Sequence, residues 1–136
     1  MTTMAMIARA SQELPAVYSA HWLLRLPLAA IILLQGYDKV PLSADDAAAF
    51  GVPVLLWAMA AFGEILAGLL LVAGAFVRNW IGDLMTRGAG AMIAAIVAGV
   101  LVTVYWQPLI DMVLYQQFHM LLLVGGLFFA LRGNKA

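Results

Sequence analysis

The sequence predicts an all-α integral membrane protein, a four-helix bundle with both termini on the cytoplasmic side. Of its 136 residues, 65% are hydrophobic and 10% charged, whereas soluble domains are about 45–50% apolar. Its apolar segments also approach the roughly 20 residues that a helix needs to cross a hydrocarbon core of ~30 Å. The length suits a single transmembrane domain, residues 1–136, with spans at about 20–36, 52–77, 84–106 and 109–131.

The first span follows a mixed segment, residues 1–19. No small-residue cleavage site follows the apolar run that ends at Leu34, so we expect this segment to be retained as an arm with a short interfacial helix. Pro27 lies near the start of the span, where proline is tolerated. Arg25 lies about one turn inside the span. Two orientations are open for it: its long side chain extends to the headgroups, or it faces the bundle.

The second span begins after a polar loop, residues 37–51, and Pro53 occupies a first-turn position. Glu64 lies close to the middle of this span. A carboxylate at that depth is costly, so it marks a candidate functional site by default. Its neighbours at helical spacing are mostly small, and small faces are where membrane helices approach closely. We therefore expect Glu64 to face other helices, together with Ala60, Ala61, Ala67 and Gly68.

The third and fourth spans differ in their signals. The third carries two ladders of small residues at four-residue spacing, which predict tight helix contact, and we expect Arg87 to extend to the near headgroups. The fourth is expected to be one helix from about Leu109 to Leu131, after Pro108. The two ladders are Gly90, Ala94 and Ala98, and then Ala91, Ala95 and Gly99.

The distribution of positive charge predicts the orientation. With both termini in the cytoplasm, that side collects six basic residues and the opposite side keeps only Lys39, beside three acids, which agrees with the positive-inside rule. The pattern is typical of a multi-pass membrane protein. The six are Arg9, Arg25, Arg78, Arg87, Arg132 and Lys135.

Glu64 and His119 are the candidate catalytic residues. Counted along straight helices from Pro53 and Leu109, the two groups lie ~16 Å and ~15 Å below the same membrane edge. One interpretation is a pair that relays a proton or binds a quinone carbonyl. The other is a histidine satisfied alone by a hydroxyl or carbonyl group within the bundle. Four polar residues are candidate binding groups: Arg25, Gln35, Lys39 and Gln116.

Several kinds of function are excluded. The chain has no cysteine, which removes disulfides, iron–sulfur clusters and thiolate metal sites. His21 and His119 are too far apart in sequence for metal-ligand spacing, so no metal site is expected. The scattered basic residues form no stripe for nucleic acid. The Gln35–Lys39 segment, taken alone, is an ordinary helix end with interfacial anchors.

Two parts of the chain carry a family resemblance: residues 23–28 with 33–39 (LLRLPL and LLQGYDK), and residues 63–74 (GEILAGLLLVAG). They resemble the DoxX-like family of small four-span bacterial membrane proteins. Residues 23–28 and 33–39 are similar to the arginine-led first helix of that family and its His-Gly-x-x-Lys type ending, with Gln35 where histidine is common. Residues 63–74 are similar to its glutamate- and glycine-rich second helix, and Arg78 follows in the turn. The specific positions are Arg25, Gly36, Lys39, Glu64, Gly68 and Gly74.

The resemblance implies a redox setting, because members are linked to quinone-coupled oxidoreductases such as the small subunit of thiosulfate:quinone oxidoreductase. We expect an accessory subunit of a larger respiratory or redox complex of the bacterial inner membrane, in contact with other subunits and lipid and near quinone. One alternative is a quinone-linked oxidoreductase subunit that uses Glu64 and His119 for proton handling, with the redox cofactor on a partner. A small transporter or proton pathway is a further alternative.

Overall fold

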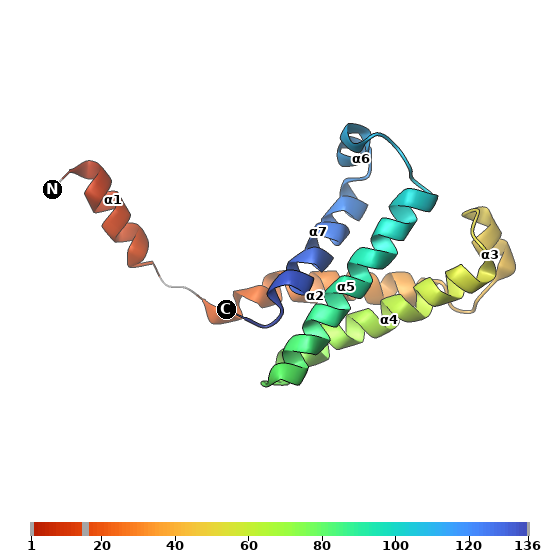
Figure 1. The fold of residues 1–136 in the computed structure, drawn as a ribbon, viewed down its shortest axis with the longest axis horizontal. Helices are drawn as coiled ribbons and strands as arrows, with labels where there is room; N and C mark the ends of the chain where they lie inside the picture. Colours follow the sequence, from red (N-terminus) through yellow and green to blue (C-terminus); the bar gives the residue numbers. More distant parts are fainter. Residues whose placement is uncertain (1, 15–16, 136) are drawn as a thin grey trace.

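The computed structural model describes residues 2–14 and 17–135, and this part of the chain is entirely helical and irregular structure (Figure 1). Four helices are long, and the others are short segments at the termini or in connections. In chain order they are α1 (Thr3–Gln12), η1 (Tyr18–His21), α2 (Trp22–Asp38), α3 (Ala44–Ala49), α4 (Val54–Phe76), α5 (Trp80–Thr103), α6 (Leu109–Tyr115) and α7 (Gln117–Arg132).

Three segments are long and apolar enough to cross a membrane: Tyr18–Asp38, Val54–Phe76 and Trp80–Thr103. The bent pair α6 and α7 makes a fourth if the two helices are taken as one span. The predicted multi-pass, all-helical character is therefore confirmed at this level.

The prediction of one continuous fourth helix is wrong. α6 and α7 are bent by 102°, and Gln116 between them has φ −116° and ψ 41°, outside the helical region. The side chain of Gln117 donates to the carbonyl of Leu114 at 2.8 Å, which satisfies an acceptor freed by the break. The 16 residues of α7 extend only ~24 Å.

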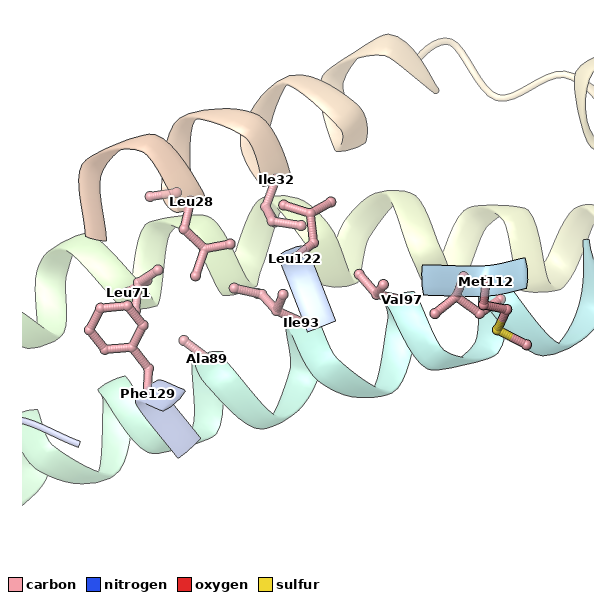
Figure 2. Close-up of a cluster of buried hydrophobic side chains, with 12 residues drawn as sticks. Leu28, Ile32, Leu71, Ala89, Ile93, Val97, Met112, Leu122 and Phe129 are labelled. Carbon is pink, nitrogen blue, oxygen red and sulfur yellow. The ribbon is translucent and has the colours of Figure 1, made fainter. Parts of the chain in front are cut away.

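The long helices pack in chain order: α2 on α4, α4 on α5, and α5 on α7. In the described part of the chain, α7 lies against α5 and is not packed on α4 (Figure 1). One continuous apolar core runs through these contacts, and Figure 2 shows it between the helices. Its most buried members include Ile32, Leu71, Ile93 and Phe129.

The contact between α5 and α7 depends on small residues. Gly90 and Ala94 are buried against Gly126. A Cβ atom on Gly90 would lie 2.5 Å from the Gly126 oxygen and the Ala130 nitrogen, both backbone atoms that cannot move aside. The first small-residue ladder is thus confirmed as a helix contact, whereas the second faces outward, since its members Ala91, Ala95 and Gly99 are exposed.

The N-terminal arm contains the predicted short helix. α1 lies apart from the bundle in Figure 1, and all its residues are exposed. Thr2 begins it by accepting a hydrogen bond from the backbone nitrogen of Ala5 at 3.3 Å. Arg9 and Glu13 form an exposed ion pair at 3.5 Å near its end.

Gly90→Ala is expected to lower the free energy of unfolding by about 1–3 kcal/mol, because the new methyl group overpacks the α5–α7 contact. Gly99→Ala is the matched control on the same helix, where an added Cβ meets no atom within 4 Å, and alanine favours helix over glycine. Unfolding in mixed detergent micelles measures both. Equal effects of the two substitutions would contradict this account of the contact.

Candidate functional site

Two buried polar clusters lie at opposite ends of α2. One is the ion pair of Lys39 and Glu64, where α2 meets α4. The other, here called the Arg25 cluster, consists of Arg25 with the residues that it contacts at the other end of α2. Every charged side chain that the structure buries belongs to one of these clusters.

Glu64 is 2% exposed, which confirms that it faces the protein interior. Its Oε2 atom lies 2.8 Å from the ammonium nitrogen of Lys39, and the two side chains are 3% and 16% exposed. Lys39 also donates to the backbone oxygen of Gln35 at 3.1 Å. Its ammonium lies 5.2 Å from the centre of the Trp57 ring, within cation–π range. Glu64 is therefore held by a nearly buried salt bridge.

The stagger of α2 along α4 makes this pair possible. A Cβ atom on Gly36 would lie 2.7 Å from Cγ1 of Ile65 and 2.8 Å from the Ala61 oxygen, so the last turn of α2 lies beside the middle of α4. Lys39 is therefore not the interfacial anchor at the outer membrane edge that the sequence predicted. Its ammonium turns back to Glu64. Gln35 contributes its backbone carbonyl, which accepts a hydrogen bond from Lys39.

His119 lies elsewhere, and the predicted pair of Glu64 and His119 is not formed. No hydrogen bond joins them within residues 2–14 and 17–135, and the ring of His119 packs 4.9 Å from Tyr105 and 5.7 Å from Phe118, centre to centre. Glu64 and His119 share a depth only if a straight helix runs from Leu109, whereas the chain bends sharply at Gln116. α7 then packs on α5, away from α4. Gln116 is half-buried at that bend.

Arg25 is fully buried, at 0% exposed, so of its two open orientations the structure has the inward one. Its Nη1 atom donates to the Leu71 carbonyl at 2.6 Å and to the Thr86 hydroxyl at 3.0 Å. Nη2 donates to Oδ1 of Asn134 at 2.9 Å, and Nε to Nδ1 of His21 at 3.2 Å. One guanidinium thus joins α2 to α4, α5 and the segment after α7.

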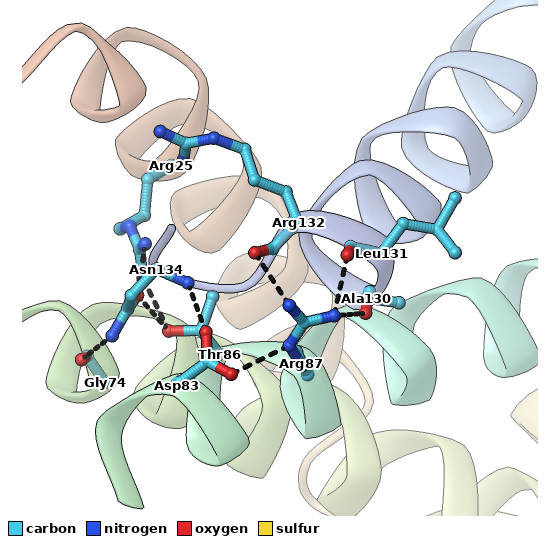
Figure 3. Close-up of polar contacts among 9 residues, drawn as sticks. All are labelled: Arg25, Gly74, Asp83, Thr86, Arg87, Ala130, Leu131, Arg132 and Asn134. Atoms are coloured by element: carbon cyan, nitrogen blue, oxygen red, sulfur yellow. Dashed lines mark hydrogen bonds and ion pairs between the residues drawn. The ribbon is translucent and has the colours of Figure 1, made fainter. Parts of the chain in front are cut away.

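Asn134 is the second centre of this cluster, and the sequence analysis missed it (Figure 3). Its Nδ2 donates to the Gly74 carbonyl at 2.7 Å, and its Oδ1 accepts from Thr86 at 2.7 Å. Its backbone nitrogen donates to Asp83 at 2.8 Å. The available signal was Gly133, which follows α7 with φ 62°. Such a glycine commonly ends a helix and here turns the next residue back to the bundle.

Arg87 closes the end of α7 and does not extend to the headgroups as predicted (Figure 3). It forms an ion pair with Asp83 at 2.8 Å. It also donates to the carbonyls of Leu131 at 2.6 Å, Arg132 at 3.1 Å and Ala130 at 3.2 Å. The last carbonyls of a helix lack partners within it and carry partial negative charge. Arg87 therefore caps α7 from α5.

The fold and these clusters define a class, a small all-helical membrane protein whose buried charges join its own helices. No family model, curated protein or solved structure matches the chain. In the described ranges, no three side chains of histidine, cysteine, aspartate or glutamate gather closely enough to hold a metal ion.

Lys39→Met is expected to lower the free energy of unfolding by about 3–5 kcal/mol, because it leaves the Glu64 carboxylate buried without its cation. The double variant Lys39→Met with Glu64→Leu is expected to recover most of that loss, since both charges are then removed. A double-mutant cycle in detergent measures the coupling.

The exposed pair of Arg9 and Glu13 is the control, with side chains 71% and 72% exposed. Arg9→Met is expected to leave the free energy of unfolding unchanged, because exposed ion pairs contribute little to stability. If the double variant at positions 39 and 64 loses as much free energy of unfolding as the two single variants added together, Lys39 and Glu64 are not coupled.

Proposed function

We propose that this chain is an accessory subunit of a larger respiratory or redox complex in the bacterial inner membrane. The observation that supports it is how the buried charges are used: Lys39, Glu64 and Arg25 all join helices of the same chain. The outward faces of the long helices are apolar, with many large exposed side chains. A rigid helical unit with an apolar exterior is suited to pack against lipid and other membrane subunits.

The proposed orientation has both termini in the cytoplasm. Four basic residues lie where α4 meets α5 and where α7 ends. The opposite end has acids in and around the connections from α2 to α4 and from α5 to α6, and the basic end is the cytoplasmic one by the positive-inside rule. The basic residues are Arg78, Arg87, Arg132 and Lys135, and the acids are Asp38, Asp45, Asp46 and Asp111.

A reporter fused after Lys135 is expected to be active only in its cytoplasmic form, because the C-terminal end follows the basic end of the bundle. A second reporter inserted beside Asp45 is expected to be active only in its periplasmic form. The opposite pattern at both positions would reverse the proposed orientation.

A second candidate function is a quinone-linked oxidoreductase subunit, which binds quinone together with a partner subunit that carries the redox cofactor. The observation that favours it is the buried ion pair, because an ionisable group inside a span is often part of a proton path. In this form of the proposal Glu64 acts with Lys39, and His119 takes no part.

Purification in mild detergent, with subunit identification and a UV–visible spectrum, tests the function. Subunits carrying haem or flavin are expected to co-isolate with the tagged chain and not with an untagged control. A colourless homo-oligomer would overturn both proposals and favour a small transporter.

The same preparation separates the two proposals. If the chain is an accessory subunit, Glu64→Gln is expected to leave the quinone-linked rate per assembled complex unchanged. If Glu64 handles protons, that rate is expected to fall at least tenfold, corresponding to about 1.4 kcal/mol or more in the barrier. His119→Phe, which removes the other candidate, serves as the matched control in the same assay.

A further inference from the structure

A cavity of about 570 Å³ lies beside the Arg25 cluster and opens widely to the surface. It is bounded by η1 and the start of α2 on one side, and by the turn from α4 to α5 on the other. Three aromatic residues form part of its wall, Tyr18, Trp22 and Phe76, and the rings of Trp22 and Phe76 are 5.4 Å apart. Its polar wall consists of Ser19, His21, Arg78, Asn79 and Asn134.

Three side chains of the polar wall, His21, Asn79 and Asn134, use their acceptor atoms within the protein and keep hydrogen-bond donors. Nδ1 of His21 accepts from Arg25, and a guanidinium can only donate, so the proton of the neutral ring is on Nε2. Oδ1 of Asn79 accepts from the backbone nitrogen of Ile81 at 2.9 Å, which leaves its NH₂ group. Oδ1 of Asn134 accepts from both Arg25 and Thr86, and one N–H of its Nδ2 goes to the Gly74 carbonyl, so one N–H remains for a ligand. A ligand that only accepts hydrogen bonds would satisfy these groups.

The charge around the cavity is positive. Arg78 lies in its wall, and Arg25 lies directly behind His21 and Asn134. The four hydrogen bonds of Arg25 all go to neutral acceptors. Asp83, which accepts from the backbone nitrogen of Asn134, is paired with Arg87. Within the described ranges no carboxylate pairs with Arg25, although buried charges are usually paired.

We propose that this cavity binds a phosphate group, and that the phosphate belongs to the headgroup of an anionic phospholipid. Arg78 supplies a charged donor, which makes the stronger hydrogen bonds to phosphate oxygens, and His21, Asn79 and Asn134 supply neutral donors. The aromatic wall suits the boundary between headgroup and acyl chain, where tryptophan and tyrosine concentrate. The site lies at the basic end of the bundle, where anionic lipid is attracted. This inference does not depend on the accessory role.

The test measures thermal stabilisation of the delipidated full-length protein in a neutral detergent. The probes are short-chain phosphatidylglycerol, the matching diacylglycerol without phosphate, and inorganic phosphate. A ligand that binds only the folded state raises the unfolding midpoint with concentration. We expect saturable stabilisation by phosphatidylglycerol, none by diacylglycerol, and an apparent dissociation constant at least tenfold higher for inorganic phosphate.

Two variants locate the binding. Arg78→Gln removes the cation of the cavity wall at an exposed turn, and we expect it to weaken phosphatidylglycerol binding at least tenfold. Lys135→Gln removes an exposed cation at the same end of the bundle but outside the cavity wall, and we expect a change below twofold.

Each remaining outcome has one meaning. Equal weakening by Arg78→Gln and Lys135→Gln would overturn the site, since it would indicate general attraction to a basic surface. Stabilisation by diacylglycerol as strong as by phosphatidylglycerol would overturn the phosphate. Inorganic phosphate binding as tightly as the lipid, with the same loss in Arg78→Gln, would support a phosphate site but overturn the lipid as its source.

Discussion

A fully buried guanidinium is the interaction on which the arrangement of the bundle depends. Arg25 projects from α2 and donates to α4, α5 and the segment after α7. A charge in the interior is tolerated only when its hydrogen bonds are made, and no single helix supplies enough acceptors. The partners must therefore converge on it. Gly74 and Thr86 lie close together at this level, and Asn134 reaches both.

The other end of α2 is held by a pair of opposite charges. The salt bridge between Lys39 and Glu64 joins the end of α2 to the middle of α4. Between the two polar clusters, the contacts are apolar and close, as at Gly36 and Gly90. This division explains how a chain with 65% hydrophobic residues specifies one arrangement of its helices. Apolar packing brings the helices together, and the two clusters select their stagger, because a shifted helix would leave a buried charge without its partners.

The polar clusters also explain where a ligand could bind. Lys39 and Glu64 neutralise each other, whereas the hydrogen bonds of Arg25 engage four of its five N–H donors without neutralising its charge. An anion in the cavity beside Arg25 would therefore balance a positive charge that the fold leaves uncompensated. His21 and Asn134 contact Arg25 on one side and line the cavity on the other, so they link the structural cluster to the proposed binding site.

The sequence by itself determined the class of fold and the inward direction of Glu64. Both follow from local properties: the length of apolar segments, and the small residues Ala61, Ala67 and Gly68 on one helical face. The tertiary structure decided the partner of each charge. Lys39 and not His119 meets Glu64, because α2 ends beside the middle of α4 and the chain bends at Gln116 before α7. The stagger and bends of the helices result from packing between them, so residues at the same calculated depth need not be in contact.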